Sequence, residues 1–338
     1  MATLLVPETH ATINAAVAAA SNGDVISIAD GTYAEYIYNT KQLTYTGRTN
    51  DPSGVVITNG ANSYTMVIGS GSFVTNATVN YTGGVGGARY AIVGWSFSAV
   101  IGVANVHINT NASGIGPSGF GSTVDRCKIV CTYKGVGYAT YGIYQTAAGS
   151  GTPTSVGSTL VLDFNHAQIY ARHTTVVNTV VHTSYVRNSS LRGIYCSHQF
   201  NNIASLDSSA TTHSGIGVFG SGGTSANCIA FGWQNATVGD YDYAAGSTNA
   251  NNLGGSDVTA SGQSVFVDAA SDDFHVNQAG VAYHSGTYTF QSTYNAFLND
   301  LDGVRFDNPP SRGAYEHVAS GGGTTTNARC RLGLKLGI

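Results

Sequence analysis

The residues VTNATV, numbered 74–79, decide the fold because their pattern returns along the chain. An apolar residue and one spacer precede an asparagine, and two spacers and a second apolar residue follow it. The copies are VANVHI (103–108), VDRCKI (124–129, with arginine at the centre), VVNTVV (176–181), FNNIAS (200–205), SANCIA (225–230) and NNLGG (251–255). The central residues, from Asn76 through Asn105, Arg126, Asn178, Asn202 and Asn227 to Asn252, lie 29, 21, 52, 24, 25 and 25 apart, and 52 is two turns of 26.

A period of about 25 residues, with short β-type runs and no helical spacing, indicates one coil per repeat. In TLVLDFN (159–165), Leu160, Leu162 and Phe164 alternate with their neighbours, as expected for a strand with one buried face. Stacked coils place like residues above like, and their inner sides merge into one continuous core. Asparagine suits a recurring corner because it tolerates the left-handed backbone conformation and bonds to nearby backbone. The sequence therefore predicts an all-β solenoid.

The composition favours short strands and tight turns and argues against two classes of partner. Charged residues make up 9% of the chain, which holds 44 glycines and 6 prolines, so a helix-rich surface is not expected. The net charge of −4 gives no basic field for nucleic acid. No stretch approaches the roughly 18 apolar residues of a membrane span. The N-terminus lacks a positively charged start and a long apolar core, so we expect no signal peptide and synthesis in the cytoplasm.

The five cysteines are scattered and odd in number. Cys127 and Cys131 stand four apart, which does not fit the Cys-x-x-Cys spacing of metal or redox motifs. We predict buried free thiols.

A short helix is predicted to close the first coil. Within residues 9–23, Ile13, Val17 and the alanines form an apolar stripe, and Thr9 is the expected N-cap. The dipeptide Asn-Gly at 22–23 is the expected stop.

Two strands follow this helix, VISIA (25–29) and TYAEYIY (32–38), joined by the hairpin-type dipeptide Asp30-Gly31. The whole opening, ATINAAVAAASNGDVISIADGTYAEYIY, resembles the start of right-handed parallel β-helix proteins of the pectate-lyase-like superfamily. SVFVDAASDDFHVNQAGVAYHSGT (264–287) and DLDGVRFDNPPSRGAYEH (300–317) resemble the closing coil of β-helix-repeat proteins.

The resemblance implies a right-handed parallel β-helix solenoid with an N-terminal capping helix and a C-terminal tail strand. We expect four parts. They are the cap helix and first strands (1–50), the β-helix coils (51–255), the C-terminal coil and cap (256–318), and a Gly/Thr linker with an anchoring β-strand (319–338).

Proteins of this superfamily include lyases, hydrolases, esterases, adhesins and phage tailspikes, so the resemblance leaves the function open. Its lyases use a basic residue as proton abstractor, often with Ca²⁺ held by carboxylates, and its hydrolases use two or three carboxylates. Asp163 is predicted to face outward, but no second acid stands one period away. The catalytic candidates are Asp163, His166 and Arg172, with His as general acid or base and Arg as base or sugar clamp.

Other basic residues surround these candidates. They are either ligand-binding positions or solvated positions on two adjacent coils. No metal or cofactor is expected, and Ca²⁺ enters only if the protein is a lyase. The ligand-binding candidates are His173, His182, Arg187, Arg192 and His198.

The C-terminal residues alternate strictly between two faces, which predicts a β-strand. Burial of its aliphatic side chains alone does not offset the entropy of ordering the strand, so it needs hydrogen bonds to a sheet edge. That β-augmentation is possible on its own solenoid or on a neighbouring subunit. The apolar face of this assembly tail consists of Cys330, Leu332, Leu334, Leu336 and Ile338.

The sequence favours a non-enzymatic structural β-helix of a phage particle or similar assembly, such as a capsid decoration protein or tail appendage, on a virion surface. The partners expected are other virion or assembly subunits, bound through the tail, and host or surface glycans. The alternatives are a polysaccharide lyase or hydrolase and a glycan-binding adhesin on the same fold.

Removal of the tail tests the assembly hypothesis. We expect the full chain to form oligomers and a variant ending at Ala319 to be monomeric, because the tail would supply the strand that pairs across the interface. Light scattering after size exclusion gives both masses. Equal masses for the two proteins would contradict a role of the tail in self-assembly.

Overall fold

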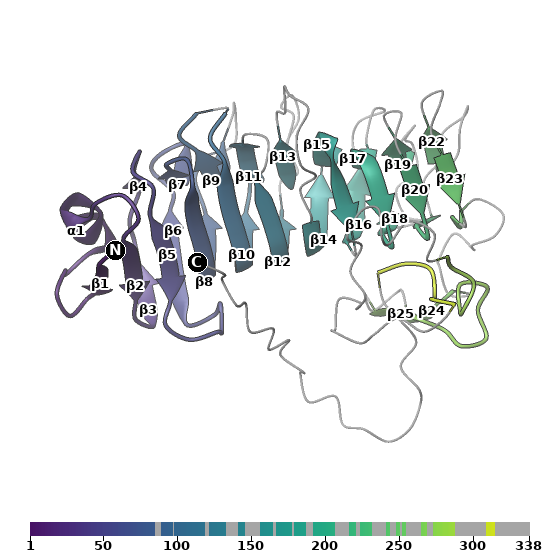
Figure 1. Ribbon diagram of the computed structural model, residues 1–338, viewed down its shortest axis with the longest axis horizontal. Helices are drawn as coiled ribbons and strands as arrows, with labels where there is room; N and C mark the ends of the chain where they lie inside the picture. The colour runs from purple at the N-terminus through teal and green to yellow at the C-terminus, as the bar shows by residue number, and fades with distance from the viewer. Residues whose placement is uncertain are drawn as a thin grey trace, which may run out of the picture.

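The chain winds in successive coils that add parallel strands to two long sheets running side by side along the molecule (Figure 1). This computed structural model describes residues 1–84, 89–96, 98–118, 122–132, 141–145, 156–164, 167–177, 179–186, 192–206, 216–220, 224–231, 241–243, 248–250, 252–254, 265–268, 273–287 and 309–314.

The first sheet consists, in spatial order, of β1 (Thr3–Val6), β2 (Val25–Ile28), β5 (Thr44–Gly47), β8 (Ser72–Tyr81), β10 (Ile101–Thr110), β12 (Thr123–Cys131), β14 (Val156–Phe164), β16 (Val180–Val186), β18 (Ile203–Leu206) and β21 (Ile229–Phe231), with β3 (Gly31–Tyr33) and β6 (Val55–Asn59) beside them. The second consists of β4 (Ile37–Tyr38), β7 (Tyr64–Ile68), β9 (Tyr90–Gly94), β11 (Ser113–Ser118), β13 (Ile143–Gln145), β15 (Ala167–Val177), β17 (Arg192–Phe200), β19 (Ile216–Gly220) and β22 (Tyr241–Tyr243), with β20 (Thr224–Ala226) and β23 (Thr248–Ala250) beside them.

The long strands of the first sheet bend at a corner. Phe73 to Thr75 of β8 pair with β5, whereas Thr78 to Tyr81 pair with β6. Asn76 stands between these two parts with φ of 56°, in the left-handed region. One coil therefore has three straight sides, and the fold is the right-handed parallel β-helix that the sequence predicts.

The corner recurs at the predicted places. The left-handed non-glycine residues include Asn76, Asn105, Arg126 and Asn227, which confirms four copies of the sequence pattern. The side chain of Asn105 donates to Oδ1 of Asn76 at 2.8 Å and to the carbonyl of Asn50 at 2.9 Å. These hydrogen bonds of the side-chain amide connect one coil to the next. They form at the residue whose left-handed backbone conformation is the least favourable of the coil.

In the FNNIAS copy the left-handed residue is Asn201 rather than the predicted Asn202. Asn202 instead reaches back to the preceding coil. Its Oδ1 accepts from the amide of Thr179 at 2.9 Å, and its Nδ2 donates to the carbonyl of Val176 at 2.9 Å. Asn252 contacts the backbone of Cys228 in the same way. Asn178 lies outside the described residues.

The core is a set of rows that run along the axis. In one such row Val79, Ile108, Ile129 and Val181 are fully buried, and β-pairing sets each above the next through Leu160 of β14. Successive side chains of a strand point to opposite faces of the sheet, so the residues before and after each member of this row point outward.

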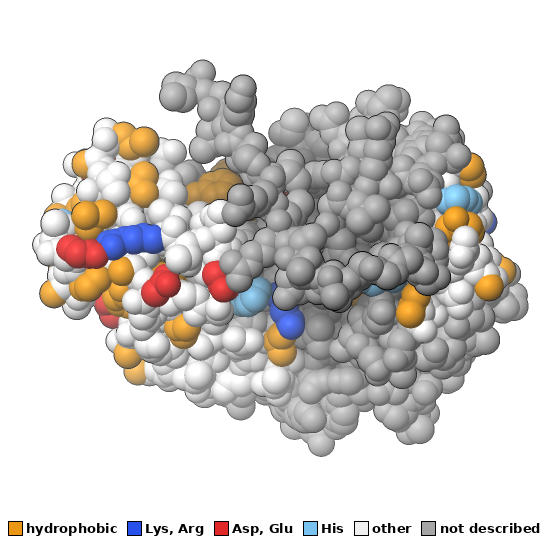
Figure 2. Space-filling view, turned by 90° about the horizontal axis from the view of Figure 1, so that it is seen from below, with side chains coloured by type: hydrophobic (Ala, Val, Ile, Leu, Met, Phe, Trp, Pro, Cys, Tyr) orange, Lys and Arg blue, Asp and Glu red, His pale blue; other side chains and the backbone are white. Residues whose placement is uncertain are grey.

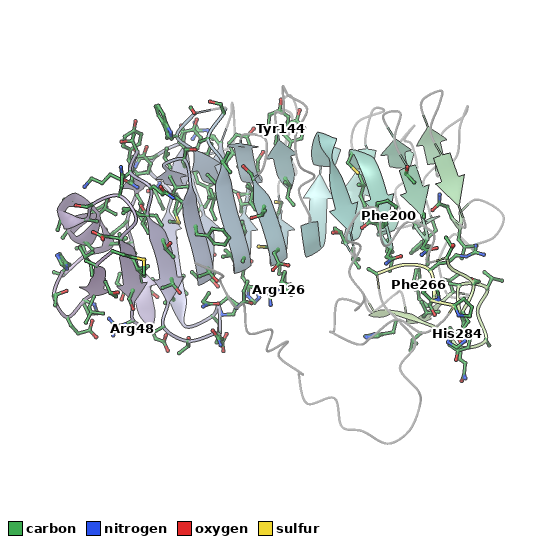
Figure 3. The ribbon with its side chains drawn as sticks, in the orientation of Figure 1. Arg48, Arg126, Tyr144, Phe200, Phe266 and His284 are labelled. Carbon is green, nitrogen blue, oxygen red and sulfur yellow. The ribbon has the colours of Figure 1, made fainter. Side chains whose placement is uncertain are left out.

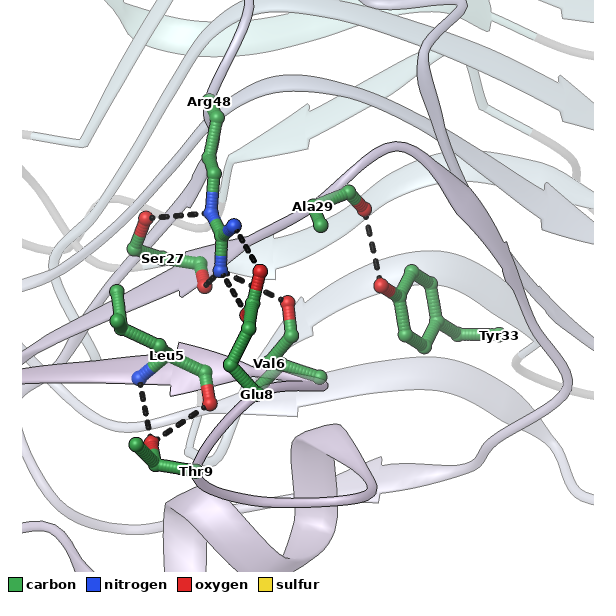
Figure 4. A network of polar contacts seen from close by, with 8 residues as sticks. All are labelled: Leu5, Val6, Glu8, Thr9, Ser27, Ala29, Tyr33 and Arg48. Carbon is green, nitrogen blue, oxygen red and sulfur yellow. Dashed lines mark hydrogen bonds and ion pairs between the residues drawn. The ribbon is translucent and has the colours of Figure 1, made fainter.

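The helix α1 (Ile13–Ala19) covers the first coil, as predicted, with Ile13, Ala16 and Val17 buried. The N-cap is Thr12 rather than Thr9: Oγ1 of Thr12 accepts from the amide of Ala15 at 3.0 Å. Thr9 instead donates to the carbonyl of Leu5 at 2.9 Å, so its hydroxyl stabilises the turn before the helix (Figure 4).

The predicted hairpin at Asp30-Gly31 is wrong. Strand β2 pairs in parallel with β5, and β3 pairs in parallel with β6, so the dipeptide turns a corner of the coil. Beside this corner Arg48 holds the first coils together. Its guanidinium forms an ion pair with Glu8 and donates to the carbonyl of Val6 at 3.1 Å (Figure 4).

The C-terminal part adds no described coil. Strands β24 (Phe266–Asp268) and β25 (Asp273–Val276) form a small antiparallel sheet that lies beside the later strands, near the label of Phe266 in Figure 3. The rings of Phe231 and Phe266 are 5.5 Å apart. The amide of Asn227 exchanges two hydrogen bonds with the backbone of Thr287, at 2.8 and 2.9 Å.

An outward row of the first sheet explains why this segment binds there. In the earlier coils the row carries Thr78, His107 and Lys128. In the later coils it carries Val180 and Ile203, which would be exposed without a cover, and then Ile229. The closing segment buries these three side chains in a separate apolar cluster with Phe266, Val276, Ala282 and Ala314.

Four cysteines confirm the prediction of buried free thiols, namely Cys127, Cys131, Cys196 and Cys228. Cys330 lies outside the described residues. Burial raises the pKa of Cys127 to about 12 and that of Cys228 to about 11.

The corner bonds should measurably stabilise the fold. We expect Asn105→Ala to lower the free energy of unfolding by about 2 kcal/mol, since it removes two hydrogen bonds and leaves alanine in the left-handed region. Asn105→Gly should cost less because glycine accepts that backbone. Asn109→Ala, which removes one exposed bond to Asn80, is the control and should change stability by less than about 0.5 kcal/mol. Urea unfolding compares them, and equal effects at Asn105 and Asn109 would refute the corner's role.

The buried thiols should be unreactive in the folded protein. In a Cys330→Ser variant we expect no labelling by Ellman's reagent at pH 8, because burial suppresses the thiolate that attacks the reagent. The same variant unfolded in guanidinium should show all four thiols. Rapid labelling without denaturant would contradict the burial of these side chains.

Candidate functional site

An apolar cluster lies outside the core, on the outer face of the second sheet. Val67 and Val93 stand next to the inward residues Met66 and Ile92, so they point outward, yet both are buried. Tyrosines cover them: Tyr90 is buried in this cluster, with Tyr36, Tyr64 and Tyr144 packed against it. We call Tyr36, Tyr38, Tyr64, Tyr90, Tyr141 and Tyr144 the tyrosine strip.

The rings of the strip follow one another across the coils. Tyr64 and Tyr90 are paired in register, and their rings are 6.5 Å apart and 13° from parallel. Tyr141 and Tyr144 stack at 4.4 Å and 25°. Figure 3 shows Tyr144 at the upper edge of the solenoid, on the side opposite the closing segment.

A glycine makes room for the central ring. A Cβ at Gly116 would lie 2.6 Å from Cγ of Tyr90, so a side chain there would push the ring away. A similar arrangement exists on the outer face of the first sheet, where a Cβ at Gly102 would lie 2.1 Å from the ring of Phe73. The two glycines form a matched pair, one on the strip and one away from it.

Two rings of the strip have a raised pKa. Burial raises the pKa of Tyr90, and the neighbouring Tyr141, Tyr144 and Tyr64 raise it further. Burial also raises the pKa of Tyr36. The phenols of Tyr36 and Tyr90 therefore remain neutral hydroxyls that donate and accept hydrogen bonds.

Polar and aromatic residues border the strip at the two ends of β9. Before the strand, Arg89 donates from Nη1 to the hydroxyl of Tyr81 at 3.1 Å. After the strand, Trp95 is 49% exposed, and on β4 Tyr38 is 57% exposed. These large, exposed rings extend the aromatic surface beyond the buried cluster.

Backbone pairing distributes the predicted polar candidates over both sheets. Asp163 on β14 pairs with Tyr185 of β16, whereas His182 pairs with Val161. These strands belong to the first sheet, while Arg192 begins β17 of the second. The register therefore does not set Asp163 and His182 opposite one another.

The remaining candidates lie on the second sheet or outside the described residues. Arg172 and His173 stand on β15, at the register shift between Ala171 and Thr175, and His198 of β17 pairs with Thr175. The candidates that lie outside the described residues are His166, Arg187 and the tail residues Cys330, Leu332, Leu334, Leu336 and Ile338.

Within the described ranges, no three His, Cys, Asp or Glu side chains gather as a metal site would require. On the face shown in Figure 2, few charged side chains are drawn on the described part of the surface, and a red and a blue one adjoin at its left end. No helix in the part of the chain that the structure describes is long and apolar enough to cross a membrane.

Sequence reasoning found only part of the strip. The closely spaced tyrosines of YATYGIY (138–144) mark Tyr141 and Tyr144 in the sequence as either a stacking platform or an ordinary ladder, whereas nothing local marks Tyr64 and Tyr90. Their separation of 26 residues, one turn of the repeat, was the available signal.

Neither a protein-family model nor a curated protein matches the chain significantly. Among solved structures, it is similar to the pectin methylesterase from Aspergillus niger in two forms. The penultimately deglycosylated form has a TM-score of 0.41 at 16% identity, covering 76% of this chain and 87% of that chain. The deglycosylated form has a TM-score of 0.39 at 17% identity, covering 77% and 87%. Matches this distant say nothing of what the chain binds or catalyses.

Proposed function

We propose that the protein is a non-enzymatic β-helix that binds polysaccharide on the tyrosine strip. The observation that carries the proposal is the outer cluster itself, in which tyrosines of several coils pack over apolar side chains that lie outside the core. An aromatic ring combines a flat apolar face with a polar rim, and a sugar ring likewise combines a C–H face with hydroxyls. The two surfaces are complementary.

The placement of the closing segment supports this choice of face. Residues 265–268, 273–287 and 309–314 include the parts that cover the first sheet's later coils, where Val180, Ile203 and Ile229 are buried. The strip lies on the second sheet, and its outermost ring, Tyr38, is 57% exposed. Tyr36, Tyr64, Tyr141 and Tyr144 are half-buried, and apolar surface that is left accessible in this way can mark a binding site.

The assembly setting remains a proposal from the sequence. A phage capsid decoration protein or tail appendage would present such a strip to host or surface glycans, with the tail strand holding it to other subunits. The second candidate function is a polysaccharide lyase or hydrolase, with Asp163, His166 and Arg172 as its sequence-based catalytic residues.

Binding to a panel of neutral and acidic polysaccharides, measured by affinity electrophoresis, tests the proposal. We expect at least one polysaccharide to retard the protein, and Tyr90→Ala to weaken that binding about tenfold, or about 1.4 kcal/mol. Gly116→Ala should weaken it as well, because the added Cβ displaces the ring of Tyr90. Gly102→Ala displaces Phe73 on the other sheet and is the matched control, which should bind normally.

Two outcomes would contradict the proposal. Retardation by no polysaccharide, or equal losses in Gly116→Ala and Gly102→Ala, would remove the strip as a binding site. Release of reducing ends or unsaturated sugars during the assay would replace binding with turnover, and Asp163→Asn would then be the first variant to test.

A further inference from the structure

The rings of the tyrosine strip lie close enough together to exchange electrons. The ring centroids of Tyr36 and Tyr38 are 6.4 Å apart, and those of Tyr64 and Tyr90 are 6.5 Å apart. Tyr36, Tyr64 and Tyr144 pack against the cluster that contains Tyr90. Electrons tunnel rapidly between aromatic rings at such separations. An electron lost by one ring of the strip can therefore be replaced from its neighbour.

These rings differ in their access to water. Tyr90 is 5% exposed, whereas Tyr38 is 57% exposed. Burial raises the pKa of Tyr90, because its surroundings disfavour a charge on the phenol. A tyrosine that loses an electron must also release its phenolic proton, since the radical cation is a strong acid. Water takes that proton most readily at Tyr38, so an oxidised state that enters the strip comes to rest there.

We propose that the strip collects oxidising equivalents and that Tyr38 is a site of oxidative cross-linking, where dityrosine joins two copies of the protein. This proposal goes beyond sugar binding and does not depend on it. Among the tyrosines whose exposure the structure describes, Tyr38 alone is more than half exposed. It lies on β4, the strand at one end of the second sheet, where a second molecule can approach its ring.

The cross-link requires a one-electron oxidant, such as a metal complex or a radical derived from peroxide. Each Tyr38 loses one electron to the oxidant and one phenolic proton to water, which leaves a neutral tyrosyl radical. Two radicals form a carbon–carbon bond between the ring positions next to their hydroxyl groups. The hydrogens on those two carbons then move to the oxygens, which restores both phenols. In total the pair loses two electrons and two protons.

Photo-oxidation of the full chain with tris(bipyridine)ruthenium(II) and persulfate tests the proposal. We expect covalent dimers on a denaturing gel, with the fluorescence of dityrosine, and Tyr38 as the main cross-linked residue by mass spectrometry. Tyr38→Phe should lose most of the dimer, because phenylalanine keeps the ring but has no phenol to oxidise. Tyr33→Phe is the control and should cross-link normally. Tyr33 is half-buried on β3 of the first sheet, where its hydroxyl donates to the carbonyl of Ala29 at 2.9 Å.

A second variant, Tyr64→Phe, tests the strip as the path of the electrons. It removes a phenol that neighbours both Tyr36 and Tyr90 and leaves Tyr38 in place. We expect less cross-linking at Tyr38 and more oxidation at Tyr90, which is cut off from the exposed end.

The outcomes separate the path from the site. An unchanged yield in Tyr64→Phe would overturn the strip as a path, since Tyr38 would then react on its own. No dimer at all, an unchanged yield in Tyr38→Phe, or cross-links mapped to other residues would overturn the site. Far-UV circular dichroism of the phenylalanine variants separates lost cross-linking from lost folding. None of these outcomes bears on polysaccharide binding, which is measured without an oxidant.

Discussion

The structure depends on one backbone constraint, the left-handed corner residue described at Asn76, Asn105, Arg126, Asn201 and Asn227. That conformation costs an ordinary residue about 1–2 kcal/mol, and asparagine reduces the cost by bonding locally. Here the side chain also crosses to the neighbouring coil, as Asn105 does to Asn76 and Asn227 to Asn201. Because the corner fixes where each coil turns, it also fixes the register of the strands on both sides. Every row of the solenoid, inner or outer, follows from that register.

Because the rows are in register, the side chains of one outward row can change from polar to apolar along the axis while the strands keep the same pairing. The outward row of the first sheet carries His107 and Lys128 in the middle coils and Ile203 and Ile229 in the later ones. The closing segment lies where the row is apolar, and a Cβ at Gly313 would lie 3.0 Å from Ile229 and 3.2 Å from Ile203. The tyrosine strip is likewise an apolar region on the outer face of the second sheet, formed by aromatic rings in place of aliphatic side chains.

The repeat and the cap helix could be predicted from the sequence because both are periodic and local. The pattern around Asn76 sets the corner, and the stripe of Ile13 and Val17 sets the helix. The strand pairing at Asp30-Gly31 was predicted wrongly. This dipeptide is typical of hairpin turns, but each flanking strand pairs in parallel with a strand of the next coil. The strip was mostly missed for a similar reason. Tyr64 and Tyr90 alternate with core residues like any strand side chain, and only their pairing across coils reveals them as neighbours.

Stacking of this kind also determines how the molecule would respond to a pull. The hydrogen bonds between coils run along the axis, so a force applied to the two ends acts on one interface at a time rather than on the whole sheet. Each detached coil would release about 80 Å of chain, from roughly 25 residues at about 3.3 Å each. Under load, a β-helix of this design would therefore lengthen in steps of about one coil each.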